Sequence, residues 1–360
     1  METKHVKYLD SLRGLAALTV VLHHVLFSVQ PPQCVSIIFY CMIAGKTSVC
    51  LFFILSGFVL SYKFIGDTGA KWKIIESIIK RPIRLAGVIL FATYLTLIQY
   101  WNIIGHPQGA LFLYEPFIHP FTFGNEYNGV LWTIDIELMG SFLVFGLLII
   151  INRFNKNTRL IILAILAICF YSSFYLFFII GIFCADIIKH YKFDAFIKYK
   201  ECISWIILFP AIYIYSYSGT TINAWGKCKW NERMICDWGY INFASGAILI
   251  FIVVLMNKRI QKFLMYNRFQ FLGKVSYSMY ATHTTICAIV SSFLIGRFLC
   301  NYFEITMLFR CLIYLPIVFL TAYLVDRFID KPTIKFSGWF AKKLVEKIHQ
   351  KMAKVECFKL

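Results

Sequence analysis

Several features that would assign the chain to a common class are missing from its sequence. It has no C-x-x-C pair, no internal repeat, no low-complexity tract and no small-x-small cleavage site after its first apolar run. The missing C-x-x-C pairs argue against a structural metal site, and the missing repeat weakens an assignment to the inverted-repeat transporters. Because the first apolar run contains Arg13, His23 and His24 and has no cleavage site, it is not a removable signal peptide.

The twelve cysteines lie mostly within apolar runs, where a cysteine serves as a small apolar side chain. Cys228 and Cys236 differ from the others because they share a polar loop. They form a disulfide if that loop faces an oxidising compartment. Otherwise they are apolar filler like the rest.

Charged residues are scarce, at 15% of the 360 residues, whereas hydrophobic residues make up 59% and the mean hydropathy is +0.70. A soluble domain has an apolar share of about 45–50%. The composition therefore predicts an all-α fold, a polytopic bundle of membrane-spanning helices in the lipid bilayer. The net charge of +18 does not indicate a nucleic-acid partner, because Lys and Arg lie in short loops between apolar runs rather than on one basic domain.

A window of about 20 apolar residues marks ten predicted spans along the chain. They are Leu12–Val29, Val49–Phe64, Leu85–Ile104, Val130–Ile151, Leu160–Tyr171, Phe174–Ile188, Ile203–Tyr217, Ile241–Met256, Val275–Ile295 and Thr306–Phe328. The fifth and sixth form one run with Ser172 and Ser173 as the only turn signal, so they are either two short helices or one long tilted helix. Residues Val35–Ala44 are apolar but too short to span, and we expect them at the membrane interface.

Basic residues are concentrated in alternate loops. They follow the second, fourth, sixth and eighth spans, whereas the loops after the first, third and seventh spans are poor in Lys and Arg. This alternation predicts ten spans with both termini cytoplasmic. We expect one membrane domain, residues 1–335, followed by a basic cytoplasmic tail, residues 336–360. The tail is either an amphipathic helix on the anionic leaflet or a solvated segment.

The first predicted span carries ionisable side chains within the segment YLDSLRGLAALTVVLHHV, residues 8–25. Such side chains are costly at membrane depth and by default suggest a functional site. Arg13 and His24 are eleven residues apart, which is about 16 Å along a helix and close to three full turns. One helix face therefore joins a cationic group near one membrane surface to an imidazole near the midplane.

Three titratable groups are expected at one depth. The helix rise places His24 about 18 Å above the start of its span, Glu137 roughly 12 Å below the outer end of its span, and His283 roughly 13 Å up the ninth span. In a hydrocarbon core about 30 Å thick, these levels coincide. The alternative is that a hydroxyl or a carbonyl satisfies each group separately. We interpret the three as the catalytic candidates.

Three arginines lie at the predicted cytoplasmic ends of spans. Arg13 begins the first, and Arg81 and Arg84 begin the third at i, i+3 spacing on one helix face. The planar guanidinium suits bidentate binding of phosphate. The alternative is the positive-inside rule alone, which explains Arg13 less well because that residue shares a face with His24. We therefore interpret the three arginines as binding the phosphates of a ligand.

Three further residues are candidates for orienting a substrate or the catalytic groups. Asp10 precedes Arg13 by three residues and is either an N-cap or an orienting partner rather than a catalytic acid. Tyr277 and Tyr280 lie on the face of His283, where their hydroxyls are expected to hydrogen-bond a buried polar group.

The order of these motifs resembles that of acyltransferase family 3, the integral-membrane acyltransferases. Over residues 8–332 the matching segments are YLDSLRGLAALTVVLHH, LFFILSGFVLSY, RPIR, NGVLWTIDIEL, SYSMYATH and IDKP. The resemblance implies counterparts of the family's essential Arg–His pair, its arginine pair and the acidic residue of its fourth span. These are Arg13 and His24, Arg81 and Arg84, and Glu137.

The resemblance also implies an activity. Members of the family transfer an acyl group, commonly acetyl, from cytoplasmic acyl-CoA to an acceptor across the membrane. The acceptor is often a sugar hydroxyl of a surface glycan such as lipopolysaccharide O-antigen. No permanently bound cofactor is implied, and acetyl-CoA is the donor substrate. We hypothesise that His24 deprotonates the acceptor hydroxyl or transiently carries the acyl group, with Glu137 or His283 orienting it. The expected location is the bacterial inner membrane.

Two other classes of function remain open at this point. A secondary transporter or proton-coupled permease would also use buried His, Glu and Arg side chains, although the chain lacks the internal symmetry typical of transporters. A non-catalytic membrane receptor or scaffold would leave the common depth of the three titratable groups unexplained.

Overall fold

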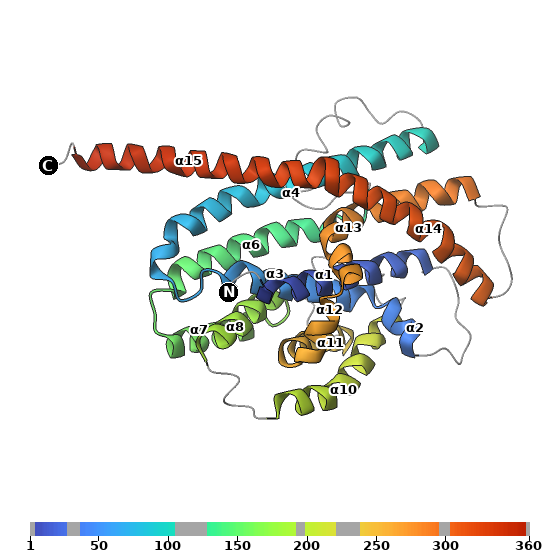
Figure 1. Ribbon diagram of the computed structural model, residues 1–360, viewed down its shortest axis with the longest axis horizontal. Coiled ribbons are helices and arrows are strands. Elements are labelled where there is room, and N and C mark those ends of the chain that lie inside the picture. The colour runs from blue at the N-terminus through green and yellow to red at the C-terminus, as the bar shows by residue number, and fades with distance from the viewer. Residues whose placement is uncertain are drawn as a thin grey trace.

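The computed structural model describes residues 4–26, 37–104, 128–191, 199–220, 238–294 and 303–357, and every regular element in these ranges is a helix (Figure 1). The elements are α1 (Lys4–Leu26), α2 (Ile37–Met42), α3 (Gly45–Tyr62), η1 (Thr68–Ala70), α4 (Lys71–Ile104), α6 (Trp132–Ile151), α7 (Lys156–Cys169), α8 (Tyr175–His190), α10 (Lys200–Thr220), α11 (Trp238–Met256), α12 (Lys258–Leu264), α13 (Asn267–Leu294), α14 (Phe303–Val325), η3 (Asp326–Asp330) and α15 (Lys331–Cys357). The predicted all-α class is confirmed for this part of the chain. Helices are the expected solution for apolar segments, because a helix satisfies its backbone hydrogen bonds internally.

Within the described residues, each of the ten predicted spans falls on helical structure, and the ambiguous run at residues 160–188 forms two helices. Asn155 caps the first of them, α7, by accepting a hydrogen bond from the backbone N–H of Thr158 at 2.9 Å. A turn then separates α7 from α8, closed by the backbone N–H of Ser173 donating to the carbonyl of Phe170 at 2.9 Å. The apolar segment expected at the interface contains the short helix α2. Cys228 and Cys236 lie outside the described residues.

Several helices are long and apolar enough to cross a membrane. By length and composition, five of the described helical segments meet that requirement, or up to six if α11 and α12, which are bent by 95° relative to each other, count as one span. Together with the apolar composition, this indicates an integral membrane protein. The number of spans and the cytoplasmic position of the termini stay predictions.

The buried side chains form three clusters, which meet around α3, α4, α6 and α13. The largest includes Phe53, Phe145, Phe178 and Phe251 and joins α3, α6, α8 and α11. A second cluster joins α1, α13 and α14, and a third joins α4, α6 and α13. The candidate site described below lies where these clusters adjoin.

Glycine allows two helix pairs to pack backbone against backbone. A Cβ atom at Gly14 of α1 would lie 2.4 Å from the backbone N of Gly273 in α13, and one at Gly273 would lie 2.5 Å from the carbonyl oxygen of Asp10. In the same way, a Cβ at Gly57 of α3 would meet the Phe178 carbonyl of α8 at 2.2 Å. Small residues permit this close approach in membrane proteins. The α1–α13 contact is important for the site because α1 carries Arg13 and His24.

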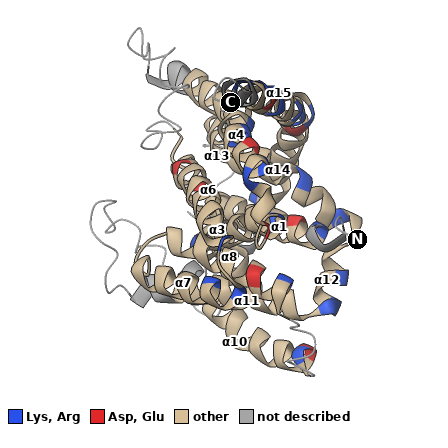
Figure 2. Cartoon of the chain, turned by 90° about the vertical axis from the view of Figure 1, so that its left-hand side faces the viewer, with Lys and Arg blue, Asp and Glu red and all other residues tan. Residues whose placement is uncertain are grey.

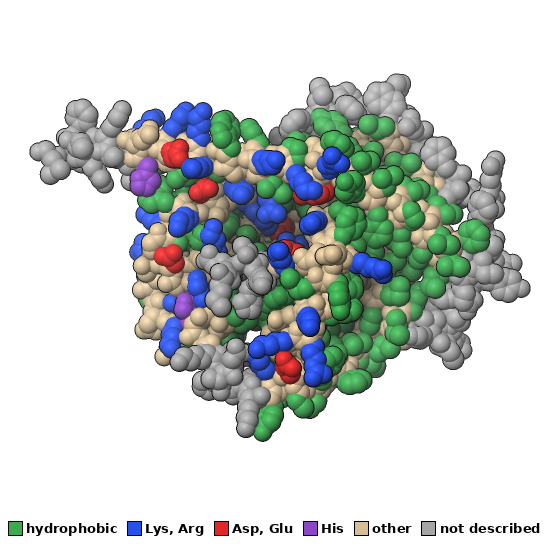
Figure 3. Space-filling view, in the orientation of Figure 1, with side chains coloured by type: hydrophobic (Ala, Val, Ile, Leu, Met, Phe, Trp, Pro, Cys, Tyr) green, Lys and Arg blue, Asp and Glu red, His purple; other side chains and the backbone are tan. Residues whose placement is uncertain are grey.

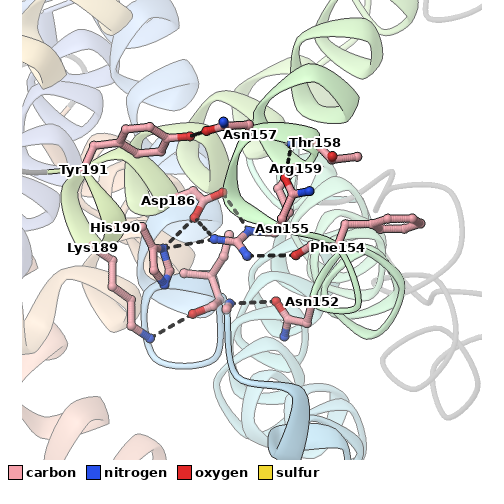
Figure 4. Close-up of polar contacts among 12 residues, drawn as sticks. Asn152, Phe154, Asn155, Asn157, Thr158, Arg159, Asp186, Lys189, His190 and Tyr191 are labelled. Atoms are coloured by element: carbon pink, nitrogen blue, oxygen red, sulfur yellow. Dashed lines mark hydrogen bonds and ion pairs between the residues drawn. The ribbon is translucent and has the colours of Figure 1, made fainter.

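A buried polar cluster joins α7, α8 and the segment after α3 (Figure 4). Arg159 donates two hydrogen bonds to Asp186, at 2.9 Å from Nε and 2.7 Å from Nη2, and both side chains are at most 5% exposed. His190 contacts the same carboxylate at 2.6 Å. Asn152 accepts a hydrogen bond from the N–H of Gly66, whose φ of 77° favours glycine. This cluster fixes α7 and α8 against the end of α3, away from the candidate site.

The C-terminal helix α15 runs along α4, as Figure 1 shows. It begins at Lys331 and continues across the predicted domain boundary at residue 335 without a break. Its buried residues Ser337, Ala341 and Val345 repeat every four positions, whereas Lys342 and Lys343 are exposed. The tail is therefore an amphipathic helix, and it packs on the N-terminal half of α4 through contacts such as Trp72 with His349, whose ring centroids are 4.2 Å apart.

Charged and apolar surface are separated on the face in Figure 3. Lys and Arg side chains gather on the half nearer the C-terminal end of α15, and hydrophobic side chains cover most of the other half. Figure 2 looks at the basic end and shows Lys and Arg on α12, on α15 and near the N-terminus. The asymmetry agrees with a membrane protein whose basic segments share one side.

Candidate functional site

A cavity lies between α1, α3, α4, α6 and α13. Its volume is about 100 Å³, smaller than the roughly 300–1,000 Å³ of pockets that enclose a drug-sized ligand. One part of its wall is charged and polar, and the rest is apolar and aromatic. The lining residues are Arg13, Val49, Phe52, Phe53, Ser56, Arg81, Arg84, Leu85, Thr133, Ile134, Glu137, Ser276, Tyr277 and Tyr280.

The three arginines predicted from separate spans meet in this cavity. Arg13 comes from α1, while Arg81 and Arg84 come from one face of α4, and all three line the wall. They are partly buried, and each interacts electrostatically with at least one of the others. Gathering three cations out of water is costly unless counter-charge is present. The arrangement is therefore suited to an anionic ligand.

Glu137 supplies negative charge to the arginines. Its carboxylate forms an ion pair with Arg81 and accepts a hydrogen bond from the hydroxyl of Ser56 at 2.8 Å. Ser141, one turn further along α6, accepts a hydrogen bond from Arg81 Nε at 2.9 Å and donates to the carbonyl of Glu137 at 2.6 Å. Both partners of the ion pair are largely buried, with side chains 11% and 17% exposed for Arg81 and Glu137.

The contacts of Glu137 bear on one alternative of the sequence-based interpretation, that this residue orients His24. Its described contacts are with Arg81 and Ser56 and with neither imidazole, while the common depth of the three groups stays a prediction. The depth estimate from helix rise did not specify which neighbours the residue faces. Three desolvated guanidinium groups attract the nearest carboxylate more strongly than a neutral imidazole does, and α6 presents Glu137 to α3 and α4.

His24 and His283 form a direct contact between α1 and α13. Nδ1 of His24 is 3.2 Å from Nε2 of His283, and the ring centroids are 5.0 Å apart. His283 is completely buried, whereas His24 retains exposed surface. Of the two residues expected to orient His24, His283 is the one in contact with it.

With both rings neutral, their hydrogen bonds determine the tautomer of each. Nδ1 of His283 lies 2.7 Å from the carbonyl oxygen of Tyr280, which only accepts, so this nitrogen carries the proton. Nε2 of His283 then accepts from Nδ1–H of His24, which also points to the carbonyl of Val20 at 2.9 Å. In this arrangement Nε2 of His24 has a free lone pair, as a general base requires.

Tyr280 lies between the cavity and the histidine pair. Its hydroxyl accepts a hydrogen bond from Thr133 at 3.0 Å and donates to the carbonyl of Val130 at 3.3 Å. Its ring centroid is 5.9 Å from that of His283 and 5.6 Å from that of Phe52. Neither imidazole is among the residues that line the cavity. The arginine-lined space and the histidine pair are thus adjacent but separated by aromatic rings.

The two remaining predicted residues lie near the arginines. Asp10 is not an N-cap, because α1 already begins at Lys4; its carboxylate interacts electrostatically with Arg13 and Arg84, which agrees with the alternative of an orienting partner. Tyr277 lines the cavity and donates a hydrogen bond to the carbonyl of Leu85 at 2.8 Å.

Sequence reasoning missed three polar residues at the cavity and one beside it. Ser56, Thr133 and Ser276 line the wall, and they lie in the motifs LSGF, LWTIDIEL and SYSMYATH, which carry no predicted role for these hydroxyls. Asp330, in the π-helix η3, is 5% exposed and its Oδ1 makes no hydrogen bond. It interacts electrostatically with Arg84. The IDKP segment was the available signal for it.

The comparisons with known proteins give one match. A family described as an acyltransferase domain, acyltransferase family 3, matches residues 6–327 of the chain. This range includes every residue of the arginine cluster and both histidines of the pair. The comparison with curated proteins and the comparison with solved structures each give no match. Among the described residues, no group of three or more His, Cys, Asp or Glu side chains is placed to hold a metal ion.

Proposed function

Because the chain belongs to acyltransferase family 3, the integral-membrane acyltransferases, we propose that it moves a short acyl group from cytoplasmic acyl-CoA to a hydroxyl of an extracytoplasmic glycan. The acyl group is acetyl, and the acceptor is a surface polysaccharide such as lipopolysaccharide O-antigen in the envelope of a bacterium. The protein then resides in the inner membrane. The observation that supports this proposal best is that α1 carries both Arg13, in the cavity wall, and His24, in contact with His283.

The arginine cluster is the proposed site for the phosphates of CoA. Arg13, Arg81 and Arg84 converge from two helices on one wall, and guanidinium groups bind phosphate oxygens through paired hydrogen bonds. The helix rise separates Arg13 from His24 by roughly 16 Å, which is of the order of the extended pantetheine arm. A donor held at the arginines would therefore bring its thioester towards His24.

His24 is the proposed general base and His283 its positioning residue. Nε2 of His283 accepts a hydrogen bond from Nδ1–H of His24. This holds the ring so that Nε2 of His24 can take the proton of the acceptor hydroxyl. The acceptor oxygen forms a bond to the acyl carbon, the C–S bond of the thioester breaks, and the departing thiolate takes the proton from His24. In the covalent alternative, Nε2 of His24 first bonds to the acyl carbon as the C–S bond breaks and CoA leaves as the thiolate. The acceptor oxygen then displaces the imidazole, and the hydroxyl proton passes to the thiolate.

Substitution of His24 tests the proposal. Purified protein in lipid is supplied with labelled acetyl-CoA and an acceptor glycan fraction, and transfer of label is measured. The wild type should transfer label and His24→Ala should not, while membrane insertion and thermal stability remain. In cells, deletion of the gene should remove acetyl groups from a surface glycan, seen by mass spectrometry. Full activity of His24→Ala would refute the assignment.

The matched control is His349→Ala. His349 is an exposed histidine of α15. It contacts Trp72 and does not line the cavity. Its removal should leave label transfer unchanged within about twofold. A similar loss in both variants would mean that the effect of His24→Ala is not specific to the site.

The transporter alternative gains no support from the family match, which is to an acyltransferase domain. A transporter would move its substrate without forming a new ester. Absence of label transfer, combined with uptake of an intact solute, would therefore favour the transporter over the enzyme.

A further inference from the structure

The cavity extends along α3 and α13 towards the histidine pair and stops one turn short of it. On α3 the lining residues run from Ser56, beside Glu137, to Val49, about 10 Å further along the helix. On α13 they run from Ser276 to Tyr280, and His283 is the next residue on the same side, about one turn beyond. The charged end of the cavity is thus opposite to the end that approaches the imidazoles.

Two aromatic side chains narrow the cavity near that end. Phe52 of α3 and Tyr280 of α13 line the cavity and meet edge to face, with ring centroids 5.6 Å apart and planes at 69°. Tyr280 continues the contact to His283 at 5.9 Å. A group that approaches His24 from the arginines must therefore pass these two rings.

The two rings differ in how firmly they are held. The hydroxyl of Tyr280 is fixed by Thr133 and by the carbonyl of Val130. Phe52 has no polar atom to anchor its side chain, is only partly buried, and packs where the cluster containing Phe53 adjoins the cluster containing Met279. The free space available to a passing group is therefore set chiefly by the size and rotamer of Phe52.

We propose that Phe52, packed against Tyr280, is the acyl-length determinant of this enzyme, admitting acetyl and excluding longer chains from the histidine pair. The inference rests on the proposed function, because it concerns the acyl group of the same donor. A chain longer than acetyl needs room for each added methylene beside the two rings. In an apolar site of fixed shape, two substrates that differ by a single methylene differ in kcat/KM by about 10-fold or more.

Phe52→Leu and Phe52→Met test the proposal, the second variant preserving more of the side-chain volume should the first fold poorly. The control is Phe251→Leu, a fully buried phenylalanine of the same cluster as Tyr280 that does not line the cavity. Each protein is assayed with acetyl-, butyryl- and hexanoyl-CoA, and kcat/KM is compared along the series. Binding of the same three compounds is measured in parallel in the His24→Ala background, where no transfer occurs.

Wild type and Phe251→Leu should prefer acetyl-CoA over hexanoyl-CoA. In Phe52→Leu the hexanoyl-to-acetyl ratio of kcat/KM should rise by about 10-fold or more. The ratio for Phe52→Met should lie between those of the wild type and Phe52→Leu. An active Phe52→Leu enzyme with the wild-type chain-length profile would overturn the proposal, as would a wild type that uses all three donors equally. If no protein, wild type included, binds or uses any acyl-CoA, the proposed function itself fails. A wild type that transfers acyl groups while Phe52→Leu keeps its profile refutes only the length determinant.

Discussion

Glu137 lies among three arginines, and it shares the counter-charge of that cluster with Asp10 and Asp330, which interact with Arg13 and Arg84. One carboxylate pairs with Arg81, while Arg13 and Arg84 remain close enough to interact with the same group of charges. Glu137 therefore stabilises the ligand-free arginine cluster, and on the proposed function the phosphates of the donor supply further negative charge to the same guanidinium groups.

We predict that Glu137→Gln lowers the stability of the ligand-free protein and that CoA restores part of it. Breaking a largely buried ion pair from one side costs about 3 kcal/mol, and an anion bound only to the folded state recovers stability by mass action. Thermal unfolding with and without CoA measures both effects. Glu346→Gln is the control, since its pair with Lys342 is exposed and worth less than about 1 kcal/mol. A Glu137→Gln protein as stable as the wild type without CoA would contradict the prediction.

Among the helices, the contact between α1 and α13 decides the geometry of the proposed catalytic pair. Gly14 and Gly273 let the two backbones approach so closely that a Cβ on either would lie within 2.5 Å of the partner backbone. His24 and His283 lie further along the same two helices, and their rings can contact one another only at a close helix separation. The glycines thus act on the site without touching it.

We predict that Gly273→Ala separates α1 from α13 and reduces acyl transfer by about 100-fold, because a shift of about 1 Å in a reacting group can have an effect of that size. Gly146→Ala is the matched control, since a Cβ at Gly146 in α6 meets no atom within 4 Å. In a helix this change should be neutral or stabilising by up to about 1 kcal/mol. Transfer assays on both variants, normalised to folded protein, measure the difference. Equal activity of the two would show that close packing of α1 on α13 is not required.

At the scale of the whole molecule, basic and apolar surfaces are divided between regions of the bundle. The face in Figure 3 carries Lys and Arg on one half and hydrophobic side chains on the other, and the helices long enough to cross a membrane include α1, α3, α4 and α6. Loops rich in Lys and Arg remain on the cytoplasmic side of a membrane. The arginines of the cavity would then face the compartment that contains acyl-CoA.

We predict that both termini and the basic loops are cytoplasmic. An epitope tag at the C-terminus should bind antibody only after the membrane is permeabilised from outside, whereas a tag inserted in the Lys- and Arg-free segment 106–129 should be accessible in intact spheroplasts. A tag in the basic segment 63–73 is the control for the C-terminal tag, because it too should bind antibody only after permeabilisation. Antibody access to the C-terminal tag in intact spheroplasts would show the opposite orientation, with the arginines on the side of the membrane that lacks acyl-CoA.

Composition and periodicity alone determined the helical class, the positions of the helices and the candidate residues, because long apolar runs must form helices and because ionisable groups stand out against them. They also place Arg13, Arg81 and Arg84 in one predicted functional group. Only the tertiary structure decided the partners. Glu137 pairs with arginine rather than histidine, α15 folds back along α4 rather than forming a separate tail, and Phe52 and Tyr280 separate the arginines from the imidazoles. Helix rise gives the depth of a residue, but which neighbour it contacts depends on how the helices pack around it.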